Sequence, residues 1–192
     1  MRTTKKIASS ITRQAGMTLT ESLLVLAVGA AVAVVAYSGY RVANSDVMAS
    51  TVSQDTVGMI GKIKQIWGGN YTTVTPTGLN NAGVITGSFK WDATASAVLD
   101  AMGNTVTFDG AQSKFAFLLG PFSKEDCAKI APGLSSIAYS INIGDAAALT
   151  GGNVGTVTGG AAYKTATTIT PANLLTGCGG TNVATKIAVE VR

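Results

Sequence analysis

The strongest constraint on this sequence is a long apolar run near its N-terminus. Residues 23–37 are apolar for fifteen consecutive positions, and the preceding segment, residues 1–16, has basic side chains but no acidic one. A basic segment before an apolar run is typical of a secretory signal, or of a membrane anchor whose basic side stays in the cytoplasm. Residues 17–40 would form a helix of about 36 Å, which is long enough to cross a bilayer.

The position of Glu21 separates these two interpretations. A cleavable secretory signal does not normally carry a carboxylate at the start of its apolar run. An ionisable group inside a membrane segment costs about 2.5–3.5 kcal/mol and usually has a partner. If the chain were cut between Gly16 and Met17, the new amine would lie four residues from Glu21. That amine could face the carboxylate of its own chain or of a neighbouring chain, which favours the anchor.

The segment Gly16-Met17-Thr18-Leu19-Thr20-Glu21, followed by the apolar run, resembles the class III signal of type IV pilins. The resemblance implies that a prepilin peptidase cuts between Gly16 and Met17 on the cytoplasmic side. It also implies that Met17 becomes N-methylated and that Glu21 guides assembly. The 16-residue leader and the methionine after the cut resemble the type IVb subclass. The Glu21-Ser22 start, the Asp- and Lys-rich lead into Cys127, and the segment 169–171 before Cys178 resemble the bundle-forming pilins, and the likeness to the toxin-coregulated pilins is more distant.

The sequence predicts one long helix over about 18–67. No proline occurs between Met1 and Val74, and apolar residues recur at three- and four-residue steps from Val52 to Trp67, which is the spacing of one helix face. The segment Gly68-Gly69-Asn70 is a strong stop. Such a helix would be about 75 Å long, with an apolar half (17–40) for the membrane or a filament core and an amphipathic half (41–69).

Two glycines, Gly29 and Gly39, lie inside the apolar half. Each costs about 1 kcal/mol relative to alanine in an exposed helix. Small residues let membrane helices pack closely, which is one interpretation. The other is a hinge at which the helix bends or locally unwinds during assembly.

The remaining residues, 70–192, predict a small α+β head. Strands are expected over 84–91, over 105–110 and 113–120 as a hairpin with Asp109-Gly110 in its turn, over 137–144, and as a half-buried terminal strand over 185–192. Short helices are expected to begin after Ser123, with Asp126 completing a capping box and an end before Pro132, and at Thr170-Pro171. Residues 145–168 lack periodicity and predict a surface loop in which Tyr163 is a candidate exposed residue.

The two cysteines, Cys127 and Cys178, favour a disulfide, because a pilin-like chain is destined for the cell exterior. A metal pair and a reactive thiol are the alternatives. The resemblance to type IVb pilins extends to this part of the chain: it implies the type IV pilin fold, in which the long N-terminal helix packs on an antiparallel-sheet αβ-roll. It also implies a C-terminal disulfide loop, the D-region, over 127–178.

No catalytic set is visible in the sequence. The chain contains no histidine, which excludes histidine-ligated metal sites and nucleophile systems that use histidine as the base. The glycine-rich residues 151–160 neither follow a strong strand nor open a helix, so they are not a nucleotide-binding fingerprint. Glu125 and Asp126 are adjacent, but in a helix their side chains would diverge by about 100°. We therefore expect no enzyme activity, no cofactor and no metal.

The charge balance depends on the leader. Four of the 14 basic side chains lie in residues 1–16, namely Arg2, Lys5, Lys6 and Arg13. Removal of the leader leaves 14 − 4 = 10 basic and 10 acidic side chains, so the mature chain would be formally neutral. The basic pI thus reflects orientation in the membrane, and we expect no nucleic-acid partner.

The resemblance implies a structural role, as the major subunit of a type IVb pilus used in adhesion, aggregation or conjugative contact. It implies many copies in a helical filament, a prepilin peptidase and methylase, and, indirectly, an assembly platform and its ATPase. The prepilin would sit in the inner membrane with its leader cytoplasmic and its head periplasmic, and would then become part of an extracellular pilus. The alternatives are a minor pilin, a type II secretion pseudopilin, and a secreted enzyme whose ordinary signal peptide is cut near 43–45.

Overall fold

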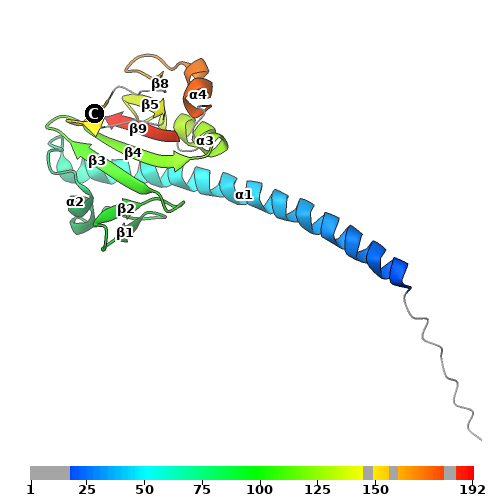
Figure 1. The fold of residues 1–192 in the computed structure, drawn as a ribbon. Coiled ribbons are helices and arrows are strands. Elements are labelled where there is room, and N and C mark those ends of the chain that lie inside the picture. The colour runs from blue at the N-terminus through cyan, green and yellow to red at the C-terminus, as the bar shows by residue number, and fades with distance from the viewer. Residues whose placement is uncertain (1–17, 145–148, 156–159, 180–184) are drawn as a thin grey trace, which may run out of the picture. The chain divides into compact units, whose positions relative to one another are not determined.

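The structure is a computed structural model, and it describes residues 18–144, 149–155, 160–179 and 185–192. The described residues form four helices and nine strands (Figure 1). In chain order these are α1 (Leu19–Trp67), α2 (Pro76–Asn81), β1 (Lys90–Asp92), β2 (Ala97–Leu99), β3 (Thr105–Gly110), β4 (Phe115–Phe122), α3 (Lys124–Leu134), β5 (Ser140–Gly144), β6 (Leu149–Thr150), β7 (Asn153–Val154), β8 (Ala161–Lys164), α4 (Pro171–Cys178) and β9 (Thr185–Val191). The chain divides into two compact units, Met1–Val42 and Ala43–Arg192, and α1 contributes to both.

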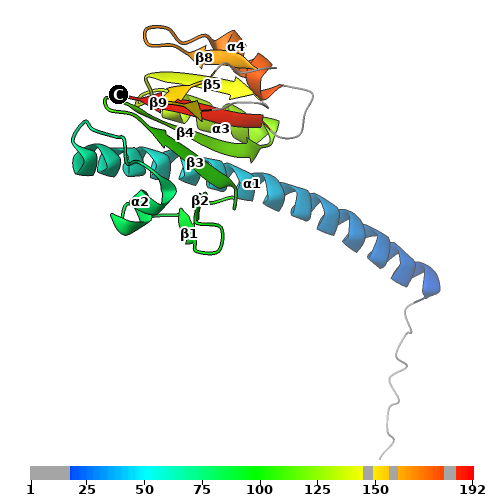
Figure 2. The ribbon, with the colours of Figure 1, turned by 60° about the vertical axis from the view of Figure 1, so that its left-hand side comes forward.

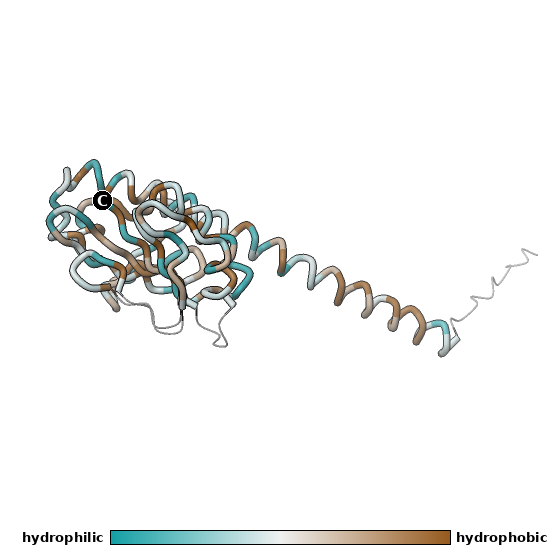
Figure 3. The backbone as a smooth tube through the Cα atoms, turned by 90° about the horizontal axis from the view of Figure 1, so that it is seen from above, coloured by the Kyte–Doolittle hydropathy of each residue, from teal (hydrophilic) through white to brown (hydrophobic). Residues whose placement is uncertain are grey.

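The long N-terminal helix predicted from the sequence is confirmed, since α1 is a continuous helix of 49 residues. Apolar residues follow one another along its first part, as the hydropathy colouring shows (Figure 3). In the second unit, one face of α1 is fully buried and enters the hydrophobic core. The buried residues of this face are Ala49, Val52, Thr56, Met59, Ile60 and Ile63. Their spacing of three and four residues is the helical repeat, so a single stripe of α1 anchors the head.

A seven-stranded antiparallel sheet forms the centre of the second unit, with the strand order β1-β2-β3-β4-β9-β5-β8. The second half of α1 lies along the sheet on the side of β3 and β4 in both ribbon views (Figure 2). Helix α3 contacts β4 and β9, and α4 contacts β5 and β8. The helices and the inward side chains of the sheet share one hydrophobic core, which includes Phe117, Ile130, Ile141 and Val189.

The terminal strand β9 lies between β4 and β5, so it is central in the sheet. Ile187, Val189 and Val191 enter the core. Side chains alternate along a strand, so Ala188 and Glu190 point to the opposite face, yet they are also buried. The hairpin β6–β7 contacts β4, β5 and β9, and it covers this second face of β9. The expectation of a half-buried strand was wrong because a hairpin that the sequence did not predict covers the second face.

The buried carboxylate of Glu190 is compensated locally. It is 4% exposed, and it forms an ion pair with Arg192, whose Nε donates to Oε1 at 2.9 Å. The Ser140 hydroxyl donates to the other carboxylate oxygen at 3.3 Å. The Arg192 guanidinium also lies 3.4 Å from the centre of the Tyr139 ring. Burial of a charge is tolerated where it is paired and hydrogen-bonded in this way.

The prediction of a strand over 84–91 is mostly wrong, since in this region the structure has only the short strand β1, Lys90–Asp92. The preceding backbone is held by α1 instead: the N–H and hydroxyl of Ser88 donate to Asp55 Oδ2 at 2.7 and 2.5 Å. Gly87 has φ +72°, and a Cβ there would lie 2.6 Å from the Asp55 carboxyl group. A long-range side-chain contact thus replaces strand pairing at this point.

Helix α2 was not predicted, although the sequence contains its signal. Thr75 caps the helix by accepting a hydrogen bond from the Gly78 N–H at 3.1 Å, and Pro76 follows at the first helical position. A second threonine-proline pair, Thr170-Pro171, stands at the start of α4, which confirms the helix predicted there, although Thr170 makes no side-chain cap hydrogen bond. Helix α2 has 6 residues, which are too few for a helical repeat of apolar residues to be recognised in the sequence.

The turn between β3 and β4 lies over 111–114, so Asp109 and Gly110 are in β3 and not in the turn. Gly110 pairs with Phe115 in the ladder. A Cβ at Gly110 would lie 1.8 Å from the carbonyl oxygen of Tyr71. The glycine is required by a close approach of two backbones rather than by a turn.

Three further expectations need correction. Helix α3 continues through Pro132 to Leu134, since its last turn is held by packing although Pro132 has no N–H to donate. Strand β5 begins at Ser140 rather than near 137. The predicted loop over 145–168 contains β6, β7 and β8, and Tyr163 on β8 is buried, not exposed. Its strands form by pairing, β6 with β7 and β8 with β5, which the local pattern of Gly, Ala and Thr residues does not reveal.

The turn from β2 to β3 depends on Asp100, which is 2% exposed. Its Oδ1 accepts hydrogen bonds from the N–H groups of Met102 and Asn104 at 2.9 and 2.8 Å, and its Oδ2 accepts from Asn104 Nδ2 at 3.3 Å. Burial raises the pKa of the Asp100 carboxyl, and the hydrogen bonds from Asn104 and Met102 only partly oppose this effect.

We expect Asp100→Ala to lower the free energy of unfolding by about 1–3 kcal/mol, because two backbone N–H groups lose their acceptor. The matched control is Asp100→Asn, which keeps an oxygen acceptor but does not titrate. The folded chain holds the Asp100 proton at pH values at which the unfolded chain has released it. The wild type should therefore gain stability relative to Asp100→Asn as the pH falls through the raised pKa. Urea unfolding in detergent at several pH values, followed by tryptophan fluorescence, measures both effects; a pH-independent difference would contradict the raised pKa.

Candidate assembly site

The first unit presents an apolar helix surface that the described residues leave exposed. Every large hydrophobic side chain from Leu19 to Val42 on α1 is between 57% and 78% exposed. Among the described residues, α1 is the helix that is long and apolar enough to span a membrane. A helix that is apolar on all sides is stable only inside a membrane or among other apolar chains. This surface is the candidate assembly site.

The start of this helix is closed by a capping box formed by Thr18 and Glu21. Glu21 Oε2 accepts hydrogen bonds from the Thr18 backbone N–H at 2.9 Å and from the Thr18 hydroxyl at 3.0 Å. In return, the Glu21 N–H donates to Thr18 Oγ1 at 3.3 Å. These reciprocal bonds satisfy backbone groups that a helix N-terminus otherwise leaves free.

In the structure, Glu21 is bonded to Thr18, a partner that the sequence analysis did not predict. The Glu21 carboxylate is hydrogen-bonded within its own chain, and Thr18 is therefore a further residue of the site. The pattern Thr-x-x-Glu before an apolar run was a readable signal for it. The two ion pairs within the described part of the chain, Lys129–Asp46 and Arg192–Glu190, do not include Glu21. Gly16 and Met17 lie outside the described residues, so cleavage, methylation and the pairing of Glu21 with an amine remain predictions.

Gly29 and Gly39 both lie within α1. A Cβ built at either position would meet no atom within 4 Å. No described residue comes close enough to require a glycine at these positions, and their roles in close helix packing or as a hinge both remain predictions.

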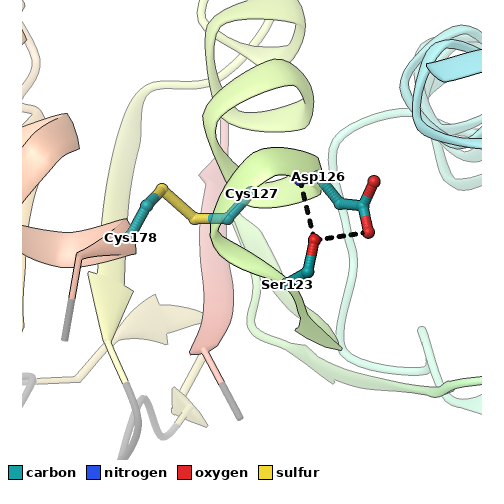
Figure 4. Close-up of a disulfide and its surroundings, with 4 residues drawn as sticks. All are labelled: Ser123, Asp126, Cys127 and Cys178. Atoms are coloured by element: carbon teal, nitrogen blue, oxygen red, sulfur yellow. Dashed lines mark hydrogen bonds between the residues drawn. A yellow bond between two sulfur atoms is a disulfide. The ribbon is translucent and has the colours of Figure 1, made fainter. Parts of the chain in front are cut away.

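In the second unit, a buried disulfide between Cys127 and Cys178 joins α3 to α4 (Figure 4). The two Cα atoms are 5.7 Å apart and the sequence separation is 51 residues. Closing a loop of that length stabilises the fold by about 4 kcal/mol in the chain-entropy model. The disulfide holds together the segment 127–178, which includes β5 and β8 as well as the two helices.

The start of α3 follows the predicted cap. The Asp126 N–H donates to Ser123 Oγ at 3.1 Å, and the Ser123 hydroxyl donates to Asp126 Oδ2 at 2.7 Å (Figure 4). The other oxygen of Asp126 accepts from the hydroxyl of Ser45 on α1. The Asp126 carboxylate thus holds the hydroxyl of the cap residue Ser123 and ties α3 to α1.

Two more contacts connect α3 with the second half of α1. Lys129 forms an ion pair with Asp46. Gly133 approaches α1 so closely that a Cβ there would lie 2.1 Å from the Ser53 hydroxyl oxygen. These contacts fix α3, and through the disulfide α4, relative to α1.

Among the described residues, no group of three or more His, Cys, Asp or Glu side chains is placed to hold a metal ion. The two sulfur atoms are bonded to each other, so the described cysteines are not available as thiolate ligands.

Comparison with solved structures identifies the fold. The chain matches TcpA, a type IV pilin from Vibrio cholerae El Tor biotype, with a TM-score of 0.51 and 15% sequence identity over 75% of this chain and 98% of that one. It also matches a type IV b pilin from Salmonella typhi, at 16% identity over 74% and 96% of the two chains; that TM-score of 0.47 is too low to add to the argument. No protein-family model matches the sequence, and no curated protein sequence matches it.

The chain therefore has the type IV pilin fold: a long N-terminal helix, an antiparallel sheet, and a disulfide in the C-terminal region. The expected fold class, α+β with this architecture, is confirmed. At 15% identity the likeness establishes the fold, and the function is argued from the surfaces described above.

We expect Thr18→Val to loosen the first turn of α1, because the helix loses the hydroxyl that caps the Glu21 N–H. Loss of an N-cap hydroxyl costs about 0.5–2 kcal/mol, which corresponds to roughly 2- to 30-fold faster local opening. Amide hydrogen exchange of the purified protein in detergent micelles measures this at residues 19–22. Thr20→Val is the matched control, since the Thr20 hydroxyl contacts only Thr18 Oγ1, at 3.0 Å; equal exchange in both variants would show that the capping box is unimportant.

Proposed function

We propose that this protein is the major structural subunit of a type IVb pilus, a helical filament in which many copies pack through their N-terminal helices. One observation carries the proposal: in a chain with the type IV pilin fold, every large hydrophobic side chain of α1 from Leu19 to Val42 is exposed. That surface needs a membrane before assembly and other copies of the same helix after it. The filament would serve adhesion, aggregation or conjugative contact between cells.

The proposed pathway follows from the charge and the length of the N-terminal segment. The basic leader, residues 1–16, stays in the cytoplasm while residues 17–40 span the inner membrane and the head lies in the periplasm. A prepilin peptidase and methylase process Gly16 and Met17, and an assembly platform with its ATPase moves the subunit into an extracellular pilus.

Packing in the filament replaces lipid around α1 with neighbouring helices. Lipid and neighbouring helices both keep this surface from water, so the exchange itself gains little hydrophobic free energy. Outside the membrane, release of a subunit would expose the surface to water at a cost of about 25 cal/mol per Å², and this cost opposes the loss of subunits from the filament. We assign register to Glu21, which would exchange its bonds to Thr18 for the Met17 amine of a neighbouring subunit. Buried ion pairs are better at specifying geometry than at adding net stability, which suits such a role.

The decisive test is mass spectrometry of the N-terminus of the mature protein from cells that express the full chain. We expect a chain that begins at Met17 and carries one methyl group on its amine. A chain that begins near residue 46 would instead identify a secreted protein with an ordinary signal peptide and would contradict the proposal. The abundance of the protein in sheared filaments then separates a major subunit from a minor pilin or a pseudopilin, both of which are present in few copies.

The role of Glu21 is tested by Glu21→Val. Leader removal should be unchanged, since the cut at Gly16-Met17 precedes this residue, but assembly should fail. Removing one member of a buried pair costs about 3–5 kcal/mol, so filament yield should fall at least about 100-fold. Glu125→Gln is the control, because it removes an exposed carboxylate on α3; normal filaments from Glu21→Val would refute the assigned role.

A further inference from the structure

The apolar half of α1 has one charged residue at each end. Glu21 is the first charged side chain of the helix and Arg41 is the next, so residues 22–40 carry no charge. The 41 − 21 = 20 steps between these two residues span about 30 Å of helix. The hydrocarbon core of a bilayer is also about 30 Å thick. One depth therefore places both charges at the surfaces of the hydrocarbon, and a shift of one turn in either direction moves one charge about 5 Å inside.

Two tyrosines stand beside Arg41 at the end of this segment. Tyr37 and Tyr40 are 65% and 68% exposed. Positions three and four residues apart are neighbours on a helix surface, so Tyr37 lies beside both Tyr40 and Arg41. Tyrosine is enriched at membrane–water interfaces because its ring is apolar and its hydroxyl is polar. We name Tyr37, Tyr40 and Arg41 the Tyr–Arg belt.

The charge of Arg41 is available for an outside partner. Arg41 is exposed, and within the described part of the chain it belongs to neither of the two ion pairs. The next acid on α1, Asp46, is paired with Lys129. A guanidinium presents its donors in a planar fork that matches the oxygens of a phosphate group. At the surface of a membrane, such phosphates belong to the lipid headgroups.

The serine hydroxyls between the two charges are satisfied by the helix itself. The Ser22 hydroxyl donates to the carbonyl oxygens of Thr18 and Leu19 at 3.1 and 3.0 Å. The Ser38 hydroxyl donates to the Val35 carbonyl oxygen at 2.9 Å. Hydroxyls that bond back to the helix in this way leave no unsatisfied donor in hydrocarbon. The segment between the charges thus suits hydrocarbon as far as the belt.

The opposite end of the segment is polar and internally bonded. The Glu21 carboxylate accepts hydrogen bonds from the N–H and the hydroxyl of Thr18, and Thr20 adds another hydroxyl to the first turn of α1. A charged group with polar neighbours is far cheaper in the headgroup layer than in hydrocarbon. The depth at which the belt lies at one surface of the membrane puts this capping box at the other.

We propose that the Tyr–Arg belt binds the phosphate groups of lipids at the periplasmic surface of the inner membrane, and that it holds the subunit at the depth that leaves Glu21 at the cytoplasmic surface. This inference rests on the proposed function, which supplies the membrane stage, and it names the phospholipid headgroup as the partner at that stage. Arg41 supplies the cation and the two tyrosine rings fix its level. Glu21 then needs no amine partner until the helix leaves the membrane.

The depth is tested with the full chain in vesicles of phosphatidylethanolamine and phosphatidylglycerol that carry a nitroxide either near the headgroup or deep in the acyl chains. One tryptophan is introduced at a time, and quenching of the fluorescence it adds to that of the wild type reports its depth. Tyr40→Trp and Leu19→Trp should be quenched at least about twofold more by the shallow nitroxide, and Ala31→Trp by the deep one, because position 31 lies midway across the hydrocarbon. Stronger quenching of Leu19→Trp by the deep nitroxide would overturn the inference, since Glu21 would then lie in hydrocarbon.

The phosphate contact is tested by lipid retention. The full chain is purified with phospholipid in a mild detergent, and bound lipid is counted by native mass spectrometry. Arg41→Gln should retain about fivefold less phospholipid than the wild type, which is the effect of one cation at a lipid surface. Lys64→Gln, which removes an exposed cation in the last turn of α1, is the matched control and should retain as much as the wild type. With a glucosyl diacylglycerol, which has no phosphate, Arg41→Gln and the wild type should bind equally.

Two further measurements separate the possible failures. Formation of the Cys127–Cys178 disulfide shows that each variant has folded, and flotation with the vesicles shows that it has entered the membrane. Equal phospholipid retention by the wild type and Arg41→Gln, or an equal loss with the glycolipid, would overturn the inference and leave the filament proposal standing. A wild-type chain that does not enter vesicles would instead refute the membrane stage of the proposed function.

Discussion

The structure depends on one helix that must satisfy two different environments. The second half of α1 buries a single stripe, from Ala49 to Ile63, in the core of the head, where apolar burial at about 25 cal/mol per Å² stabilises the fold. The large hydrophobic side chains of the first half are exposed among the residues that the structure describes. A folded monomer therefore satisfies only part of its hydrophobic surface, and the remainder is available for a membrane or for other copies.

The head is organised so that the surface it presents is well defined. Asp126, Lys129 and Gly133 attach α3 to α1, and the disulfide attaches α4 to α3. Strand β9 then lies at the centre of the sheet and joins elements from both ends of the head. The free edge at β8 is also protected: the Thr170 N–H donates to the Tyr163 carbonyl at 2.8 Å, and the Asn173 side chain donates to the Ala162 carbonyl at 2.8 Å. A protected edge reduces uncontrolled strand pairing between heads that are crowded together.

Local sequence signals predicted the elements that depend on neighbouring residues. The bounds of α1, the cap at Ser123 and the proline start of α4 were readable because each rests on contacts within a few positions. The same rules would have found the capping box at Thr18 and helix α2, since both contain the required pattern. Errors appeared where a distant contact replaced a local one, as when Asp55 holds Ser88 and when Tyr71 approaches Gly110.

The sequence by itself determined that this chain has a basic N-terminal segment, a long helix with an apolar half, a carboxylate at the start of that half, and two cysteines in the residues that follow the helix. These features follow from composition and short-range spacing. Only the tertiary structure decided that β9 is central, that Tyr163 and Glu190 are buried, and that Asp126 and Lys129 tie α3 to α1. Pairing and packing between distant segments decide such features, because a strand's register and cover are set by its partners and are not encoded in its own periodicity.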